Sequence, residues 1–337
     1  MQSGPTLSIV VPVFNEEAIL DTLHARVVEA LEGSGERFEL VLVDDGSRDG
    51  SWQKMTAAAA RDPRVVLVRL SRNFGHQVAI TAGVDAARGE AVVLMDADLQ
   101  DPPEVIPEMI ARWRAGYDVV YGRRSSRLGE SWFKRATAAA FYRTIRGLTS
   151  VDIPADTGDF RLMSRRVVEV LKRLEERNRF VRGLVAWIGW RQTAVEYERA
   201  ERLAGETKYP LRKMVRFAAD AIVSFSIAPL RVATALGLVV STFSFGYAVY
   251  AVLARIFSWD VVQGWASLMV AVMFLGGVQL ISLGVIGEYV GRVYDEVKRR
   301  PLYVADVRRA GEAPAESPFV EANDRRTERS EDRRPAS

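Results

Sequence analysis

The sequence predicts an α/β domain with a mostly parallel sheet, followed by a pair of helices long enough to cross a membrane. Three observations support this fold class. Short apolar runs alternate with helical stretches over residues 1–125. A polar motif follows each apolar run, and two long uncharged stretches come after residue 228. Alternating strands and helices predict parallel strands that are covered by helices on both faces.

The elements of the first domain follow one another at short intervals. Strands are expected at residues 7–11, 38–43, 65–70 and 91–95, and helices at 18–32, 51–61 and 75–88. Pro12 is expected to end the first strand, because proline has no backbone N–H to donate. The polar motifs after the four strands are VPVFNEE, VDDGSRDGS, SRNFGH and MDADLQD. Ligands of open parallel sheets bind beyond the carboxyl ends of the strands, so these motifs are predicted to line one crevice.

Composition narrows the class of protein further. The chain has 337 residues, of which 48% are hydrophobic and 26% charged, with a net charge of +3 and a mean hydropathy of -0.01. This mild positive charge suits a membrane surface better than a nucleic acid, which selects a strong basic stripe. Cysteine is absent, and His24 and His76 are the only histidines, so a thiolate or histidine-rich metal site is not expected. No Gly-rich dinucleotide loop or Walker loop is present.

Two apolar segments, at about residues 232–254 and 266–288, predict a transmembrane hairpin because each is long enough to cross a bilayer. Basic residues precede the first segment and follow the second, whereas the loop FSWDVVQGW between them lacks lysine. The positive-inside rule therefore places both flanks, and both termini, in the cytoplasm. The alternative is a pair of buried helices in a soluble protein. The N-terminus carries no basic signal segment, which also indicates a cytoplasmic N-terminal domain.

Two further stretches, at about residues 131–148 and 209–227, combine basic and aromatic side chains in an amphipathic pattern. Such helices can lie in a membrane interface. The alternative is a surface helix that packs on its own domain. Residues from about 308 onward contain few large apolar side chains and are expected to form a disordered cytoplasmic tail.

The motif DADLQD concentrates carboxylates at the end of the fourth strand. If the strand continues through them, Asp96 and Asp98 lie two residues apart and point to the same side. Two carboxylates this close repel each other unless a cation or a proton separates them, and oxygen ligands favour Mg²⁺ or Mn²⁺. We therefore predict a binding site for a metal ion and a diphosphate. Asp101, just before PPE, is expected to cap the next helix.

Five motifs in order give the chain a specific resemblance: VVPVFNEE, VDDGSRDGS, DADLQDPPE, TGDFRLMSR and GETKYPLRKM. Together with the hairpin, they resemble the family 2 glycosyltransferases of GT-A fold, and more narrowly the polyprenyl-phosphate glycosyltransferases. The resemblance covers roughly residues 5–300. It implies a catalytic domain at 1–228 that includes the two interface helices, transmembrane helices within 229–295, and a tail at 296–337.

The resemblance also implies roles for individual residues. The nucleotide-sugar-binding residues would be Pro12, Phe14, Glu16, Val43, Asp45, Asp96, Ala97 and Arg124. Asp96 and Asp98 match the pair that holds the metal, either Mg²⁺ or Mn²⁺. Arg202, Lys208 and Tyr209 match the region that binds the acceptor phosphate, although an ordinary solvated loop is the alternative there. The catalytic residues would be Asp159, Asp98, Arg202 and Lys208. Because a phosphate acceptor is already largely dianionic at pH 7, we expect Asp159 to position groups more than to act as an obligatory base.

The activity implied by the resemblance is inverting transfer of a sugar from a nucleotide sugar to polyprenyl phosphate at the cytoplasmic membrane. UDP-glucose is the donor indicated by the bacterial branch; UDP-N-acetylhexosamine, a UDP-aminoarabinose type and GDP-mannose remain open. The partners would be the lipid, the bilayer and further copies of the chain, with a tetramer as a plausible assembly. The rival readings are a processive polysaccharide synthase, whose QxxRW motif is missing from this sequence, and a non-catalytic membrane scaffold.

Overall fold

The computed structural model describes residues 4–124, 157–177, 179–198, 228–256 and 265–309. The chain divides into an α/β unit (residues 1–142, 151–208 and 300–337) and a helical unit (residues 143–150 and 209–299). The α/β unit is therefore discontinuous in sequence, because a segment from beyond the helical unit belongs to it.

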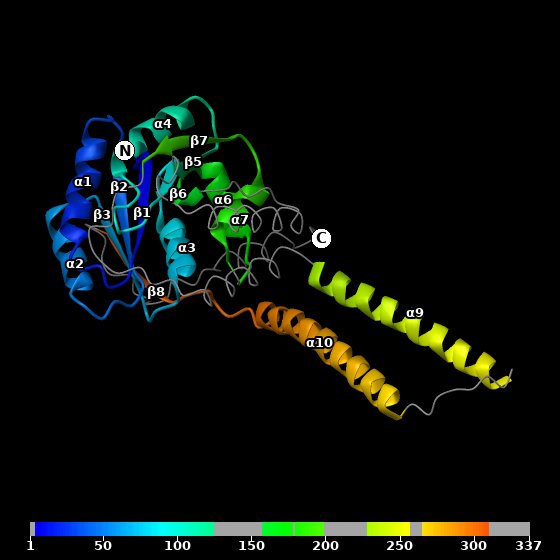
Figure 1. The fold of residues 1–337 in the computed structure, drawn as a ribbon. Helices are drawn as coiled ribbons and strands as arrows, with labels where there is room; N and C mark the ends of the chain where they lie inside the picture. Colours follow the sequence, from blue (N-terminus) through cyan, green and yellow to red (C-terminus); the bar gives the residue numbers. More distant parts are fainter. Residues whose placement is uncertain (1–3, 125–156, 178, 199–227, 257–264, 310–337) are drawn as a thin grey trace, which may run out of the picture. The chain divides into compact units, whose positions relative to one another are not determined.

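A mixed sheet forms the centre of the α/β unit (Figure 1). Its described strands lie in the order β7-β5-β6-β4-β1-β2-β3-β8. Their bounds are β1 (Leu7–Val13), β2 (Phe38–Asp44), β3 (Val65–Leu70), β4 (Ala91–Leu94), β5 (Val119–Arg124), β6 (Thr157–Ser164), β7 (Gln192–Tyr197) and β8 (Ala305–Arg308). The pairs β4–β1, β1–β2, β2–β3 and β5–β7 are parallel, and β6 and β8 are antiparallel to their neighbours. The expected mostly parallel sheet is confirmed.

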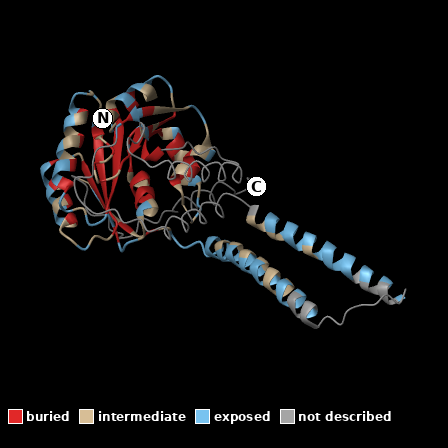
Figure 2. Cartoon of the chain, in the orientation of Figure 1, coloured by how far each residue is buried: buried red, intermediate tan, exposed pale blue. Residues whose placement is uncertain are grey.

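Helices cover both faces of this sheet, as the alternating pattern predicts. The helices are α1 (Leu20–Glu32), α2 (Ser51–Arg61), α3 (His76–Ala86), α4 (Ile106–Arg114) after a 3-10 turn η1 (Pro103–Val105), α6 (Arg165–Arg173) and α7 (Val181–Ile188). α1, α2 and α4 pack on one face, and α3, α6 and α7 pack on the other. The strands β1, β2, β3, β4 and β6 are almost wholly buried (Figure 2), and burial on both faces explains the continuous apolar runs in the sequences of β1 to β4.

Pro12 does not end the first strand, contrary to expectation. β1 continues to Val13, and Pro12 pairs with Val43 of β2 in a parallel register. Proline lacks only the donor of a ladder hydrogen bond and already has an extended-compatible φ, so a strand can pass through it near its end. The carboxyl end of β1 therefore lies two residues farther along than the sequence suggests.

The sequence does not predict the strand β8, because the family resemblance assigns residues 296–337 to a tail. Ala305–Arg308 pairs antiparallel with β3 and forms an edge of the sheet. Just before it, the buried Tyr303 donates a hydrogen bond to Asp85 Oδ2 at 2.8 Å. Just after it, Arg309 Nη1 donates to Glu39 Oε2 at 2.7 Å, with both side chains largely buried. These contacts anchor the C-terminal segment to the α/β unit.

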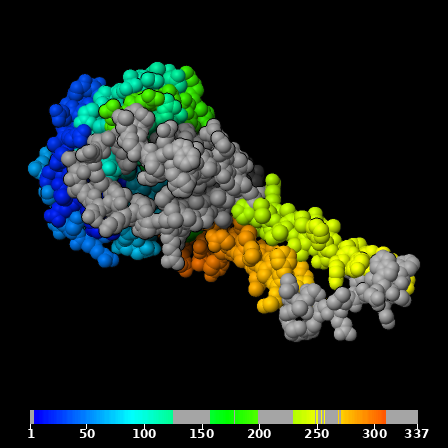
Figure 3. Space-filling model, in the orientation of Figure 1, coloured from blue at the N-terminus to red at the C-terminus, as the bar shows by residue number. Residues whose placement is uncertain are grey.

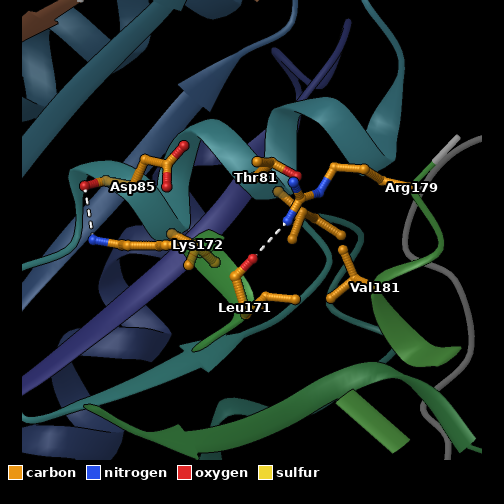
Figure 4. A pocket seen from close by; sticks show the side chains of 8 residues that line it. Thr81, Asp85, Leu171, Lys172, Arg179 and Val181 are labelled. Carbon is orange, nitrogen blue, oxygen red and sulfur yellow. Dashed lines mark hydrogen bonds between the residues drawn. The ribbon is translucent and has the colours of Figure 1, made fainter. Parts of the chain in front are cut away.

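A small hollow lies between α3 and α6, near the start of α7 (Figure 4). Arg179 reaches across it and donates hydrogen bonds to the carbonyl oxygens of Leu171 and Leu174, at 3.0 and 2.6 Å. A cation at the C-terminus of a helix satisfies free carbonyl groups and stabilises the helix dipole. Lys172 Nζ likewise donates to the carbonyl oxygen of Asp85 at 3.2 Å. The hollow therefore serves helix packing.

The helical unit contains two long apolar helices, α9 (Ala228–Ile256) and α10 (Trp265–Val297), which contact each other (Figures 1 and 3). Residues Pro229–Tyr247 and Ala271–Val297 are long and apolar enough to cross a membrane. Their large side chains are mostly exposed: Phe243 is 77% exposed and Met273 72% (Figure 2). Within the described residues neither span is buried, which argues against the alternative of two buried core helices.

Candidate active site

The turn after β4 carries Asp96 and Asp98 at the carboxyl edge of the sheet. β4 ends at Leu94, and the left-handed backbone of Leu99 (φ 53°) belongs to the turn that follows. The two carboxylates are therefore not alternate residues of a strand, and the expected geometric reason for their proximity is wrong. Asp98 Oδ1 instead accepts a hydrogen bond from the Gln100 N–H at 3.2 Å, which shapes the turn itself.

One oxygen atom of Asp96 is buried without a hydrogen bond. Its Oδ1 accepts none from any described residue, although the side chain as a whole is 35% exposed. Burial raises the pKa of Asp96 to about 6; the charges of Asp159, Asp101 and Asp98 add to the rise, and His76 opposes it. A buried acceptor without a partner is costly, and a cation would satisfy it.

Asp96 and Asp98 fit a Mg²⁺ or Mn²⁺ ion that takes part of its ligands from the substrate. Among the described residues, no group of three or more His, Asp or Glu side chains could hold a metal ion. Mg²⁺ commonly binds through one or two carboxylates and takes its remaining ligands from water and substrate phosphates. The unsatisfied Oδ1 of Asp96 and the adjacent carboxylate of Asp98 match that mode of binding.

Asp159 lies on β6 with both carboxylate oxygens engaged. Oδ1 accepts a hydrogen bond from Arg182 Nε at 3.1 Å, and Oδ2 accepts one from Gln77 Nε2 at 3.2 Å and lies 3.3 Å from His76 Nε2. Burial alone would raise its pKa, but the hydrogen bond with His76 and the charges of Arg182 and Arg161 hold the pKa of Asp159 well below its usual range. A carboxylate with so low a pKa is a weak proton acceptor near pH 7.

His76, the first residue of α3, connects Asp159 to Asp96. Its Nε2 lies 3.3 Å from Asp159 Oδ2 and 3.5 Å from Asp96 Oδ1. Burial lowers the pKa of His76, but the hydrogen bond with Asp159 and the charges of both carboxylates outweigh this and raise it overall. Gly75 turns the chain into α3 with a φ of 98°, which favours glycine.

His76, Gln77, Arg161 and Arg182 were not predicted as site residues. For His76 a signal exists, because it ends the motif SRNFGH, which follows the third strand and is predicted to line the crevice; Gln77 is the residue after that motif. Arg161 lies within the motif TGDFRLMSR but had no assigned role. It is buried, and its Nη2 donates to the carbonyl oxygen of Gly158 at 2.9 Å. No local pattern marks Arg182, which reaches Asp159 from α7.

The loops after β1 and β2 are connected by hydrogen bonds from backbone N–H groups to side-chain oxygen atoms. The Asn15 N–H donates to Ser47 Oγ at 3.1 Å, and the Arg48 N–H donates back to Asn15 Oδ1 at 2.8 Å. The Glu16 N–H donates to Ser51 Oγ at 2.9 Å. The motifs VPVFNEE and VDDGSRDGS therefore form one surface, as their shared position beyond the strands predicts.

Asp45 connects this surface to the start of α3. Its carboxylate accepts hydrogen bonds from the N–H groups of Phe74 at 2.7 Å and Gly75 at 3.0 Å, and burial raises the pKa of Asp45. At the neighbouring Gly46 (φ 72°), an added Cβ would lie 2.6 Å from the backbone nitrogen of Asn73. The loops after β2 and β3 therefore lie too close together to admit a side chain at Gly46.

The other predicted nucleotide-binding residues differ in exposure. Phe14 is 43% exposed at the loop after β1. Pro12, Val43 and Ala97 are buried, so their side chains belong to the core of the domain. Glu16 is partly exposed beside Phe14. Of this group, Phe14 and Glu16 present side chains at the surface.

Arg124, at the end of β5, reaches the acidic turn through Asp101. Its Nη2 lies 3.6 Å from Asp101 Oδ1, and its Nε donates to the hydroxyl oxygen of Tyr197 at 3.4 Å. The Tyr197 hydroxyl in turn donates to Asp101. Asp101 does not cap the following turn or helix, contrary to expectation, since neither η1 nor α4 has a side-chain cap. A carboxylate that is 1% exposed needs charged or hydrogen-bonding partners, and Arg124 and Tyr197 supply them.

Several predicted features lie outside the described residues. They are the acceptor residues Arg202, Lys208 and Tyr209 and the two expected interface helices at 131–148 and 209–227. Of the predicted site residues, the structure brings Asp96, Asp98, Asp159 and Arg124 to one edge of the sheet, and His76 lies between Asp96 and Asp159.

Comparisons with known proteins show the family to which this chain is related. The family model described as glycosyl transferase family 2 matches residues 8–172, and the GtrB C-terminal hairpin matches residues 228–293. An uncharacterised glycosyltransferase of Bacillus subtilis, YkcC, is 52% identical over 88% of this chain and 92% of its own length. The bactoprenol glucosyl transferase of Shigella phage SfII is 46% identical over 88% of this chain and 96% of its own. A more remote solved structure, glucosyl-3-phosphoglycerate synthase of Mycobacterium tuberculosis with Mn²⁺ and UDP-glucose, is 21% identical, with a TM-score of 0.39 over 65% of this chain and 78% of that chain.

Proposed function

The chain belongs to glycosyl transferase family 2, and from this premise we propose that it transfers glucose from UDP-glucose to a polyprenyl phosphate with inversion at the anomeric carbon. The observation that carries the proposal is the pair of carboxylates, Asp96 and Asp159, with His76 between them at the carboxyl edge of the sheet. It occurs in a chain that matches a bactoprenol glucosyl transferase over nearly its whole length.

The donor would bind across the loops beyond β1, β2 and β4. Phe14 offers an exposed ring for a planar base, and Glu16 and Asp45 belong to the same surface. Pro12, Val43, Ala97 and Arg124 complete the proposed nucleotide-sugar set. Asp96 and Asp98 would hold Mg²⁺ or Mn²⁺, which stabilises the negative charge that the departing diphosphate gathers.

The acceptor is itself an anion, so it must be brought close to another anion. We assign Arg202, Lys208 and Tyr209 to binding its phosphate, because charge-assisted hydrogen bonds offset this repulsion. A phosphate monoester with a second pKa of about 6 is largely dianionic at pH 7 and attacks without first losing a proton. Asp159, which is engaged by His76, Gln77 and Arg182, therefore orients groups around the sugar.

The helical hairpin would hold the enzyme at the membrane where a polyprenyl phosphate resides. Both helices are long and apolar enough to span, and basic residues flank them on one side, with Arg255 at the far end of the first span as the exception. We propose a multi-pass protein of the cytoplasmic membrane with both termini in the cytoplasm. The helices at 131–148 and 209–227 would lie at the interface, and several copies of the chain would assemble, with a tetramer as the proposed form.

A donor screen tests the proposal. The full chain, purified in detergent, is incubated with undecaprenyl phosphate, Mg²⁺ or Mn²⁺, and one of UDP-glucose, UDP-N-acetylglucosamine, a UDP-aminoarabinose or GDP-mannose. Lipid-linked sugar is the readout, and Asp98→Ala is the control. Product from UDP-glucose alone, lost in the control, supports the proposal. Product from a different donor corrects the sugar but keeps the reaction class.

No product from any donor, in folded protein that still binds UDP, would favour the scaffold alternative and refute the enzymatic proposal. NMR of the product distinguishes inversion from retention, because the anomeric proton coupling of the lipid-linked sugar reports its configuration. A product with the anomeric configuration of the donor would refute direct displacement by the acceptor phosphate.

A further inference from the structure

His76 occupies an unusual position between two carboxylates that have different surroundings. The same nitrogen, Nε2, lies 3.3 Å from Asp159 Oδ2 and 3.5 Å from Asp96 Oδ1. The first contact meets the geometry of a hydrogen bond, whereas Asp96 Oδ1 receives no hydrogen bond from any described residue. One imidazole N–H therefore serves Asp159 and leaves Asp96 with an unsatisfied acceptor.

Asp159 is held by donors from two elements, α7 and α3. Arg182 comes from α7, Gln77 and His76 from the start of α3, and Asp159 itself sits on β6. Gln77 also accepts a hydrogen bond from the Val181 N–H through Oε1 at 2.9 Å, so its amide group is fixed at both ends. Each oxygen of Asp159 thus faces a donor, and both oxygens are engaged by protein groups.

Removal of the imidazole would change this arrangement. Two carboxylates in reach of one nitrogen atom repel each other once that nitrogen is gone, and the repulsion is relieved by a proton or a cation between them. A divalent cation bound by two protein carboxylates has fewer positions left for substrate phosphates. Tighter binding of the cation would then go with slower transfer.

We propose that His76 is a positioning residue that holds Asp159 away from the cation and so reserves the cation at Asp96 for the donor diphosphate. This inference rests on the proposed function, because it assumes that Asp96 binds the cation. It concerns the binding of the cation to the protein alone, which can be measured whether or not any sugar is transferred.

The test measures two quantities on the full chain in detergent: the dissociation constant for Mn²⁺ without nucleotide, from the EPR signal of free Mn²⁺, and kcat for transfer. We expect His76→Ala to bind Mn²⁺ at least ~5-fold more tightly and to lower kcat by ~10-fold or more, as expected for a misplaced group at an active site. His76→Gln keeps an N–H donor and should restore most of both values. Weaker or unchanged Mn²⁺ binding in His76→Ala overturns the proposal.

A matched control and a rescue variant separate this role from a general effect on folding. His24, the other histidine of the chain, also pairs with an aspartate, since its Nε2 lies 3.0 Å from Asp62 Oδ2. His24→Ala should leave Mn²⁺ affinity and kcat as in the wild type. Adding Asp159→Asn to His76→Ala should return Mn²⁺ affinity toward the wild-type value, because the competing carboxylate is gone. A double variant that stays as tight as His76→Ala refutes the proposal, even if the wild type transfers no sugar.

Discussion

The close packing of α3 against the sheet depends on Gly83. The substitution Gly83→Ala tests how much stability is lost when a methyl group is added there. A methyl carbon added to Gly83 would lie 2.9 Å from Val43 Cγ2 and closer still to Val10 Cγ1. Carbon atoms in contact normally stand about 3.5–4.0 Å apart, so the helix or both valines must move. Overpacking of this kind lowers the free energy of unfolding by ~1–3 kcal/mol, and because the overlap is severe we expect a loss of ~3 kcal/mol. Alanine recovers ~1 kcal/mol of helix propensity, which leaves a net loss of ~2 kcal/mol.

The assay is thermal unfolding of the α/β unit within the full chain, where ~2 kcal/mol corresponds to a Tm lower by roughly 4–8 °C. Val10→Ala alone should cost ~2 kcal/mol, the value for removing a buried valine side chain. It also removes the closest overlap, so the double variant should be less destabilised than the sum of the two by ~1–2 kcal/mol. Gly33→Ala is the control, because Gly33 has a negative φ and no atom near its added Cβ. The reasoning would be refuted if the stability losses of the two single variants were additive in the double variant, or if Gly83→Ala were as stable as the wild type.

Three further predictions concern charge and metal. Asp62 has its pKa lowered to about 2, because hydrogen bonds from Arg64 and His24 outweigh the effect of burial. Its folded pKa lies below the unfolded value, so its contribution is present above about pH 4 and is lost as the pH falls toward 2. Asp62→Asn should cost ~1 kcal/mol at pH 7 after solvent screening, and thermal unfolding at pH 3 should show a smaller difference; an undiminished difference contradicts this. The variant Asp159→Asn should retain measurable sugar transfer at pH 8. Complete loss of transfer in a variant that still binds UDP would refute the positioning role of Asp159. Chelation by EDTA should abolish transfer, Mn²⁺ should restore it, and Mn²⁺ affinity should fall below pH 6 as Asp96 takes a proton; a pH-independent affinity between pH 7 and 5 would count against this.

Sequence reasoning was accurate where a signal is local. The helix Ser51–Arg61 and the strand Val65–Leu70 match their expected bounds, because apolar periodicity and flanking turns lie within the elements themselves. The position of the polar motifs beyond the strands follows from the parallel topology and was predicted for the same reason. Membership of a glycosyltransferase family was likewise visible in five motifs.

Features that depend on distant partners were missed. His76 and Asp159 are 83 residues apart, and no periodicity links them. Asp101 has the local pattern of a helix cap, but the fold buries it beside Tyr197 and tertiary contacts override the local preference. The strand Ala305–Arg308 is too short and too polar to read as a strand without β3 beside it. In each case the partner decides the role, and the partner is known only once the chain is folded.

The C-terminal strand also sets an order of events during synthesis. Leu70 of β3 pairs with Ala305 of β8, so the ribosome must add more than two hundred residues, both apolar helices included, before this edge can close. At translation rates of roughly 5–20 residues per second, the unpaired edge of β3 waits for roughly 10–50 seconds. An open strand edge invites pairing with other chains. With the hairpin spanning the membrane as proposed, the nascent protein reaches the membrane insertion machinery while its sheet is still unfinished, and delayed insertion would show first as aggregation of the nascent chain.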